Sequence, residues 1–518
     1  MNARIDALST PRSLVRGIFW NALGRGPPIL AALVATPVLL SQLGVDRWGL
    51  FTLASGIIGS FGMLDFGVSA ALTRALAERI GTENEQDAAA LVITALALLL
   101  LTSLAGSVVA FAAVPWFVGR ILHVPQSLHG EVILTFKILA ASGPLIVVNA
   151  ALWGVLAAYQ RFRAANLIGI PCAVVCYVGP ILSLMIQGSL AMAILPLVAA
   201  RMIQSVVYAI LAIRLIPTLR CFPRPRLSLL RDLVRIGAWM TVSNTLAPLM
   251  TYVDRFIVGA TASLAAVSYY TTPVDFMWRV TLVPLAVMTA LFPAVASIHQ
   301  RDPKRIPALM RTGSLVVIVT VFPACVAMVG LGRELMTLWL GAPFATESHL
   351  VLILVGGGVF FSCLAGLPSS MLDGVGRPEI GAFFLIAQAI LFPPAIAGMA
   401  LAFGIQGAAA IWALRAILNY VGRLYVCGRV IPFIQPAAKS VFGVSLVGGG
   451  ALLACALLGP LSLKLAAMGV AALGVPLLAA GRLLEGAEIA RLRQALHVVL
   501  RPLHSSDRIA PTRTELRG

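Results

Sequence analysis

Residues 16–78 contain two apolar stretches of membrane length, separated by a short polar segment. They read RGIFWNALGRGPPILAALVATPVLLSQLGVDRWGLFTLASGIIGSFGMLDFGVSAALTRALAE. A helix that crosses a bilayer needs about 20 mostly apolar residues, and the runs 18–40 and 48–72 both meet this requirement. The residues between them, which include Asp46 and Arg47, are then expected to form a turn. This stretch therefore predicts a pair of antiparallel transmembrane helices.

The composition of the whole chain extends this prediction. Of its 518 residues, 59% are hydrophobic and only 11% are charged, and the mean hydropathy is +0.96. A soluble domain carries about 25% charged residues, so the chain has too few charges for a water-facing surface of this size. Disordered chains are poor in apolar residues, which excludes disorder as well. The chain is predicted to be an all-α polytopic membrane protein.

Apolar runs predict about 14 transmembrane helices. The short links at 186–190 and 402–404 leave open whether either pair of neighbouring runs forms one helix. The predicted spans are 18–40, 48–72, 88–118, 133–158, 164–186, 190–215, 236–258, 265–297, 313–339, 347–371, 380–402, 404–427, 438–458 and 462–482.

The net charge of +18 is distributed unevenly over the loops between these spans. Cytoplasmic loops of membrane proteins collect Lys and Arg. With the N-terminus placed inside, 28 basic residues fall on the inner side, 4 on the outer side and 6 within spans. This predicts a multi-pass protein with both termini in the cytoplasm. Because the loops account for the charge, we expect no nucleic-acid partner.

The two halves of the chain resemble each other. Six spans separate the matching positions, so both copies run in the same direction, as in a parallel repeat about an axis along the membrane normal. The repeat predicts an N-terminal six-helix bundle at 18–215 and a C-terminal six-helix bundle at 236–427, with two extra C-terminal helices at 438–482. The matching pairs are Arg16 and Arg235, Trp20 and Trp239, Arg161 and Arg377, and Arg201 and Arg415, at offsets of 219, 219, 216 and 214.

Three segments outside the bundles are expected on the cytoplasmic side. They are the N-terminus at 1–17, a basic linker at 216–235 and a basic tail at 483–518. The tail mixes arginines with apolar residues, which fits either a basic amphipathic helix on the membrane surface or a solvated tail.

Several short motifs resemble those of a known family. They are Trp20–Asn21, Leu43–Gly44, Trp48–Gly49–Leu50, Leu64–Asp65–Phe66–Gly67 and Arg74, together with GVGRPEIGAFFLIAQAILFPPAIAGMALAFGIQGAAAIW at 374–412. With these motifs the chain resembles the polysaccharide transporter family, whose members are flippases of O-antigen or exopolysaccharide lipid-linked oligosaccharides. This family belongs to the multidrug/oligosaccharidyl-lipid/polysaccharide exporter superfamily.

The resemblance implies a V-shaped pair of six-helix bundles around a central cavity. It also implies a polyprenyl diphosphate carrying an oligosaccharide as the substrate, flipped from the inner to the outer leaflet of a bacterial inner membrane for surface polysaccharide biosynthesis. Membrane lipids are expected partners, and a polysaccharide polymerase and chain-length proteins are candidate protein partners. Two alternatives stay open, a multidrug-type cation-coupled exporter and a multi-pass glycan polymerase or ligase. The longest outer loop, 119–132, is too sparse in reactive side chains to indicate such an enzyme, so we expect no catalytic residues.

Basic residues within the spans are candidates for binding the diphosphate. A charge at bilayer depth costs at least about 2.5–3.5 kcal/mol unless it is paired or hydrated, so each one requires an explanation. Arginine can hold phosphate oxygens with two parallel donors. The alternatives are a structural pair between Arg25 and Asp65, and hydrogen bonds from Arg201 and Arg415 to backbone carbonyls. The candidate diphosphate-binding residues are Arg25, Arg201, Arg279 and Arg415.

Acidic residues within the spans are candidates for a coupling-ion site, which implies transport driven by a proton or sodium gradient. They are Asp65, Asp254 and Asp275. Asp275 and Arg279 are spaced i, i+4, so they can pair on one helix face and, with Asp254 and Arg255, form an ion-paired cap holding two helices. That structural role is the alternative to ion coupling. The seven cysteines form no CxxC motif and no histidine completes a ligand set, so we expect no metal and no cofactor.

Overall fold

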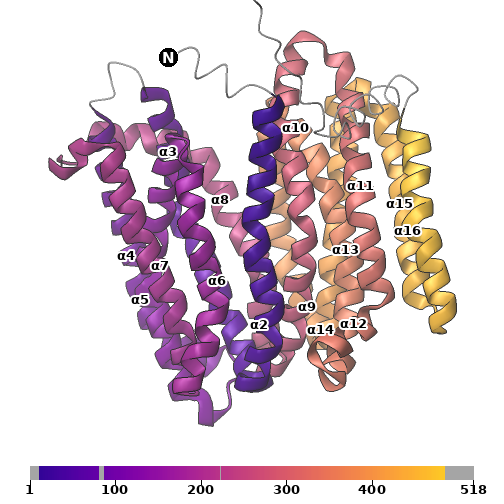
Figure 1. Ribbon diagram of the computed structural model, residues 1–518, viewed down its shortest axis with the longest axis horizontal. Helices are drawn as coiled ribbons and strands as arrows, with labels where there is room; N and C mark the ends of the chain where they lie inside the picture. Colours follow the sequence, from indigo (N-terminus) through magenta and orange to yellow (C-terminus); the bar gives the residue numbers. More distant parts are fainter. Residues whose placement is uncertain (1–10, 81–86, 222, 485–518) are drawn as a thin grey trace, which may run out of the picture.

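The computed structural model describes the backbone of residues 11–80, 87–221 and 223–484. It also describes their side chains, except at 11–25, 227–228, 230–244, 283, 290, 293 and 300. Every regular element in these ranges is a helix, as expected from the composition. Figure 1 shows two groups of helices side by side, with α2 between them.

The N-terminal group forms the indigo and magenta half of Figure 1. Its long helices correspond to the first six predicted spans, and short 3-10 turns connect several of them. The elements are α2 Pro11–Ser60, η1 Phe61–Asp65, α3 Val68–Arg79, α4 Ala88–Arg120, η3 Gln126–Leu128, α5 His129–Ala158, α6 Phe162–Ile186, α7 Leu190–Leu215 and η4 Pro217–Cys221.

The C-terminal group forms the orange half of Figure 1, and α15 and α16 lie at its outer edge. Its first helix, α8, is labelled in Figure 1 among the helices of the other half. Its elements are α8 Leu227–Thr261, α9 Leu264–Trp278, η5 Arg279–Thr281, α10 Leu282–Arg301, η6 Pro303–Arg305, α11 Ile306–Gly330, α12 Gly332–Leu340, α13 Ala342–Gly374, α14 Pro378–Val430, η7 Pro432–Ile434, α15 Gln435–Leu457 and α16 Leu461–Leu483.

Two of these helices consist of two arms that meet at a glycine. Gly44 in α2 has φ 75° and Gly404 in α14 has φ 61°, and neither is helical. Glycine adopts positive φ at little cost because it lacks a Cβ atom. In Figure 1, α2 runs from the upper to the lower end of the molecule, whereas α3, which follows its second arm, lies at the upper end. The chain therefore reverses at Gly44, within the predicted turn between the first two spans.

The number of membrane spans agrees approximately with the sequence prediction. Within the described ranges, ten helices are long and apolar enough to cross a membrane, or eleven if α9 and α10, bent by 44°, form one broken span. Treating the arms of α2 and α14 as separate spans, and adding α8 with its 35 residues, gives the fourteen expected helices. The prediction of an all-α polytopic membrane protein is confirmed.

Two of the predicted segments outside the bundles overlap with helices. α8 begins at Leu227, within the linker expected at 216–235. The sequence LSLLRDLV at 227–234 mixes leucine and valine with Arg231 and Asp232, so the helix can begin in the interfacial region and continue into the membrane. The segment 11–17, expected as part of the N-terminus, is likewise the first part of α2.

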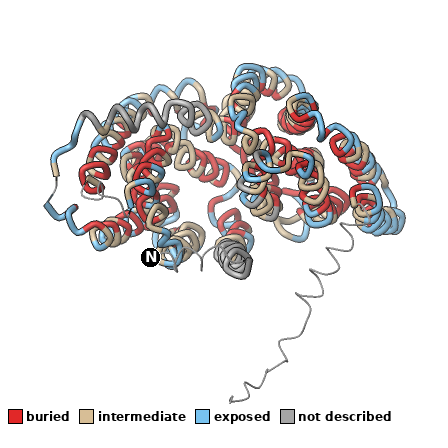
Figure 2. The backbone as a smooth tube through the Cα atoms, turned by 90° about the horizontal axis from the view of Figure 1, so that it is seen from above, coloured by how far each residue is buried: buried red, intermediate tan, exposed pale blue. Residues whose placement is uncertain are grey.

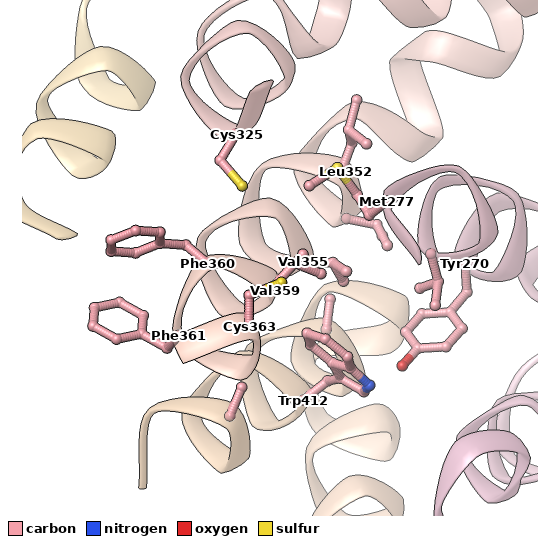
Figure 3. Packing of buried hydrophobic residues seen from close by; sticks show 14 of the residues in the cluster. Tyr270, Met277, Cys325, Leu352, Val355, Val359, Phe360, Phe361, Cys363 and Trp412 are labelled. Atoms are coloured by element: carbon pink, nitrogen blue, oxygen red, sulfur yellow. The ribbon is translucent and has the colours of Figure 1, made fainter. Parts of the chain in front are cut away.

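The buried residues form two cores. Figure 2 shows that buried positions face the inside of each group of helices and exposed positions face outward. The smaller core lies entirely in the N-terminal group and includes Leu72, Val92 and Tyr208. The larger core spans both groups, since it includes Val118 of α4 and Phe136 of α5 as well as residues of α2 and of the C-terminal helices. Figure 3 shows Met277 and Trp412 in its C-terminal part. The second arm of α2 is thus packed against the C-terminal group.

Candidate functional site

The two groups of helices meet through hydrogen bonds between α2 and α9. The indole N–H of Trp48 donates to the hydroxyl of Thr272 at 2.9 Å. The hydroxyl oxygens of Thr52 and Thr271 lie 3.0 Å apart. Trp48 and Thr52 lie in the second arm of α2, shortly after the reversal at Gly44. These contacts therefore join the groups near the lower end of the molecule in Figure 1.

Two glycines of α2 allow α8 to approach closely. A Cβ atom at Gly59 would lie 2.4 Å from the ring and hydroxyl of Tyr252, and one at Gly56 would lie 3.5 Å from that ring. Gly56 also faces the side chain of Arg255, at 3.7 Å from its Cδ atom. The interface between the groups thus brings Tyr252 and Arg255 directly against α2.

Arg255 of α8 forms an ion pair with Asp275 of α9. Its Nη1 donates to Oδ2 at 3.2 Å, and its Nη2 donates to Oδ1. The Arg255 side chain is 5% exposed, whereas that of Asp275 is 41% exposed. Asp275 therefore pairs with Arg255 and not, as the i, i+4 spacing suggested, with Arg279. The reason is that α9 ends at Trp278 and the chain continues as the 3-10 turn η5, which changes the direction of Arg279.

Asp254 is buried beside this pair, with 1% of its surface exposed. One carboxylate oxygen accepts a hydrogen bond from the Tyr270 hydroxyl at 2.9 Å, and the other accepts one from the backbone N–H of Arg255 at 2.9 Å. A buried carboxylate requires such donors because it has lost its water. Asp254 and Asp275 thus lie next to the same arginine, one fully buried and the other half-exposed.

Asp275 and Arg279 line a cavity of about 180 Å³ between the two groups of helices. Trp48 from α2 and Tyr177 from α6 line it from the other side. The Arg279 guanidinium donates to the Tyr177 hydroxyl at 3.2 Å, and its carbon lies 5.8 Å from the centre of that ring. The two predicted residues on α9 and η5 therefore share a cavity to which both bundles contribute.

Arg201 and Arg415 lie within their own bundles, not in the lining of this cavity. Arg201 donates to the amide oxygen of Gln204 at 3.1 Å. Arg415 donates to the amide oxygen of Gln388 at 3.4 Å, and its guanidinium carbon lies 4.4 Å from the centre of the Phe392 ring. The two repeat-related arginines thus both contact a glutamine side chain. The Nε atom of Arg415 is buried and has no hydrogen-bond partner among the described residues.

The remaining two predicted residues lie near the start of the chain. The Arg25 side chain is outside the described residues, although its backbone belongs to α2. Asp65 accepts hydrogen bonds from the backbone N–H of Ser69, at 3.1 Å, and from the Ser69 hydroxyl. Asp65 therefore accepts a free N–H of the first turn of α3, whose N-cap is Gly67, and its pairing with Arg25 stays a prediction.

The tyrosines of the site were not predicted from the sequence. Tyr177, Tyr252 and Tyr270 lie within apolar spans and contact Arg279, Arg255 and Asp254, respectively. A tyrosine hydroxyl at bilayer depth requires a polar partner. The presence of tyrosine within an apolar span could therefore have identified these three residues as candidates from the sequence. Within the described ranges no group of three or more His, Cys, Asp or Glu residues could hold a metal ion.

Comparison with known proteins places the chain in a family. A profile of polysaccharide biosynthesis proteins matches residues 14–299, which is more than half of the chain. The chain belongs to this family of polysaccharide biosynthesis proteins. The match extends from α2 through most of α10, so it includes Asp65, Asp254, Asp275 and Arg279 and confirms the resemblance drawn from the short motifs.

Two relatives of this family member cover much of its length. A candidate O-antigen transporter of Shigella flexneri is 26% identical over 419 residues, which are 79% of this chain and 96% of the relative. The membrane protein EpsK of Bacillus subtilis (strain 168), described as uncharacterised, is 23% identical over 337 residues, covering 62% of this chain and 64% of EpsK.

Solved transporter structures have the same fold. An inward-facing multidrug resistance MATE family transporter of the MOP superfamily matches with a TM-score of 0.67 and 16% identity, covering 78% of this chain and 95% of that chain. The lipid II flippase MurJ, in an inward closed conformation, matches with a TM-score of 0.63 and 14% identity, covering 92% and 99%. At these identities the likeness establishes the architecture of this polysaccharide biosynthesis protein, and not its substrate.

Proposed function

We propose that the protein flips a polyprenyl-diphosphate-linked oligosaccharide from the inner to the outer leaflet of a bacterial inner membrane by alternating access. The observation that carries this proposal is the charge of the cavity between the bundles. Asp275 is neutralised by Arg255, whereas Arg279 has only the neutral Tyr177 hydroxyl as its hydrogen-bond partner among the described residues. Arg279 therefore offers the cavity a guanidinium that has no carboxylate partner among the described residues, which suits an anionic headgroup.

The family and the relatives support the same reading. The chain belongs to a polysaccharide biosynthesis family, and the relative that it covers almost completely is a candidate O-antigen transporter. The lipid II flippase, which shares the fold, acts on a lipid-linked substrate by its own name. A lipid-linked saccharide is the substrate class that we infer from these names together.

The geometry suggests how access could alternate. The bundles are joined near one end by the bonds from Trp48 and between Thr52 and Thr271. Breaking these contacts and closing the opposite end would expose the cavity to the other face of the membrane. Rocking of two bundles around a fixed site is the mechanism expected for a parallel repeat.

Asp254, Asp275 and Asp65 are proposed as the candidates for coupling to a proton or sodium gradient. The positions of Asp254 and Asp275 support this role. Asp254 accepts a hydrogen bond from the backbone N–H of Arg255, and Asp275 forms an ion pair with its guanidinium, at the interface between the bundles. An ion that neutralises one carboxylate would weaken its hold on Arg255 and so change the contact between the bundles. Asp65 accepts a hydrogen bond from the first turn of α3, which makes a structural role the simpler one for this residue.

A multidrug-type cation exporter is the second candidate. The specific observation in its favour is that Asp275 lines the cavity and is 41% exposed, so a cationic drug could compete with Arg255 for it. A MATE multidrug resistance transporter has the same fold, so the fold is compatible with this alternative. The uncompensated charge of Arg279 disfavours it, because a cation would be repelled.

The wider assignment follows from the proposed transport. The protein is then a transporter and not an enzyme, with both termini in the cytoplasm and with lipid-linked oligosaccharide and membrane lipids as its partners. A polysaccharide polymerase and chain-length proteins are the candidate protein partners, because they would use the flipped product.

The test is reconstitution of the full chain into liposomes. A polyprenyl diphosphate carrying a labelled short oligosaccharide is added, and its transfer between leaflets is followed by its accessibility to an impermeant reagent. Transfer faster than in protein-free liposomes is expected. Export of cationic dyes in the same vesicles, without transfer of the lipid-linked oligosaccharide, would establish the second candidate instead.

A further inference from the structure

A second cavity, separate from the cavity between the bundles, lies at the junction of α14 and α15. Its volume is about 420 Å³, and it is an open groove on the outside of the C-terminal bundle. The chain passes from α14 through η7 into α15 beside it. None of its lining residues also lines the cavity between the bundles, so a molecule in this groove is separate from the one proposed to be transported.

One wall of this groove is apolar. Val421 and Leu424 of α14 face Ala438 and Phe442 of α15. Val421 is 37% exposed, and Phe442 is half-buried. An apolar surface of this kind at the edge of a membrane bundle accommodates hydrocarbon chains without the cost of desolvating polar groups.

The end of the groove carries two cations. Arg429 and Lys439 both line it and are both exposed. Arg429 is held in place by Tyr425, whose hydroxyl accepts a hydrogen bond from Nη2 at 2.9 Å and whose ring centre lies 5.3 Å from the guanidinium carbon. Within the described part of the chain, no acidic residue lines the groove. The positive charge of this end is therefore available to an anion.

We infer that this groove binds one anionic diacyl phospholipid of the inner leaflet. The phosphate contacts Arg429 and Lys439, and an acyl chain lies along the apolar wall formed by α14 and α15. Basic pockets between helices on the cytoplasmic side of a membrane are suited to anionic headgroups, and the loop between α14 and α15 is on the proposed cytoplasmic side. The C-terminal tail is a poorer occupant, because residues 485–518 carry six arginines against four acidic residues and repel the same cations.

The contributions of the two cations and of the apolar wall to lipid binding can be tested with separate variants. The variant Arg429→Gln with Lys439→Gln removes both cations. The variant Ala438→Phe fills the groove and keeps both cations. The matched control is Arg301→Gln with Lys304→Gln, which removes two exposed basic residues from another loop of the same side. None of these residues belongs to the cavity between the bundles.

The measurement is native mass spectrometry of the delipidated full chain, titrated with phosphatidylglycerol or phosphatidylcholine. The wild type and the control are expected to bind one phosphatidylglycerol more tightly than phosphatidylcholine. Each cation near an anionic lipid contributes about a factor of five, so loss of both is expected to weaken phosphatidylglycerol binding about twenty-fivefold. Ala438→Phe is expected to weaken the binding of both phosphatidylglycerol and phosphatidylcholine.

Three outcomes would overturn the inference. In the first, the Arg429 and Lys439 variant binds phosphatidylglycerol as tightly as the wild type. In the second, the control variant loses as much affinity as the groove variant, which would indicate a general effect of surface charge. In the third, a polyprenyl phosphate displaces phosphatidylglycerol at equal concentration, which would make the groove a substrate site.

Discussion

Arg255 of α8 and Asp275 of α9 form an ion pair across two consecutive helices, and the arginine is buried whereas the carboxylate is half-exposed. The charge of the buried arginine is compensated by this half-exposed carboxylate together with the adjacent, fully buried Asp254. A ligand or ion that reaches Asp275 through the cavity therefore acts on Arg255, which lies against α2 of the other bundle. This pair connects the cavity to the contact between the bundles.

Replacing Asp275 by Asn leaves the buried Arg255 without its carboxylate. The free energy of unfolding is expected to fall by about 1–3 kcal/mol, the usual cost of a buried polar group that loses its partner. The double variant Arg255→Met with Asp275→Leu removes both charges and is expected to recover most of this loss. Thermal unfolding of the purified variants gives the comparison. A double variant less stable than both single variants would contradict the pairing.

Replacing Tyr270 by Phe removes the hydroxyl donor from Asp254. Because Asp254 is fully buried, the expected loss of stability is about 1–3 kcal/mol. The neighbouring Tyr269→Phe is a matched control, since Tyr269 packs against Phe344 with ring centres 4.9 Å apart and does not contact Asp254. Equal unfolding temperatures for the two variants would show that the Tyr270 hydroxyl does not stabilise the carboxylate.

Replacing Trp48 by Phe removes one hydrogen bond between the bundles while keeping an aromatic ring. The equilibrium is expected to shift towards the state that opens the cavity to the outer face. Thr36 lines the cavity, so Thr36→Cys provides a site for an impermeant thiol reagent added to whole cells. Labelling at this cysteine is expected to become faster when Trp48→Phe is added. A rate unchanged by this substitution would mean that the bond does not hold the outer side closed.

Features of the architecture that are set by the thickness of the bilayer could be predicted from the sequence. Features that are set by the packing of one helix against another could not. The spans follow from the sequence because a bilayer requires apolar runs of a certain length, and the turn at Gly44 falls where the first two runs separate. The partner of Asp275 does not follow, because it depends on how α8 and α9 are rotated against each other. The i, i+4 rule suggested Arg279, but the helix ends at Trp278 and the rule no longer applies.

The pairing of the repeat-related arginines shows the same limit. Their equivalent positions were readable as an offset of 214 between Arg201 and Arg415. Their partners were not, because Gln204 lies on the same helix as Arg201, whereas Gln388 lies on the other arm of α14 from Arg415. Sequence patterns locate charges at bilayer depth, and packing between helices selects their partners.

The proposed orientation is tested by reporter fusions in loops at the two ends of the bundles. Fusions at Asp46 and Gly341 are expected to report the outer side, and a fusion at Pro225 the cytoplasm, because the basic residues concentrate on the side of Pro225. Activity assays of paired reporters, one active on each side, provide the measurement. An outer-side signal at Pro225 would reverse the topology.

The measurement that most directly tests the central claim is the rate of oligosaccharide-lipid transfer by Arg279 variants in liposomes. Arg279→Ala is expected to reduce the rate about ten- to a hundredfold, the value of a charge-assisted hydrogen bond to phosphate. Arg279→Lys is expected to recover only part of it, because lysine cannot donate two parallel bonds. Arg333→Ala, which removes an exposed arginine of α12, is the control and is expected to match the wild type. Transfer by Arg279→Ala at the rate of this control, in vesicles with equal amounts of folded protein, would contradict the account.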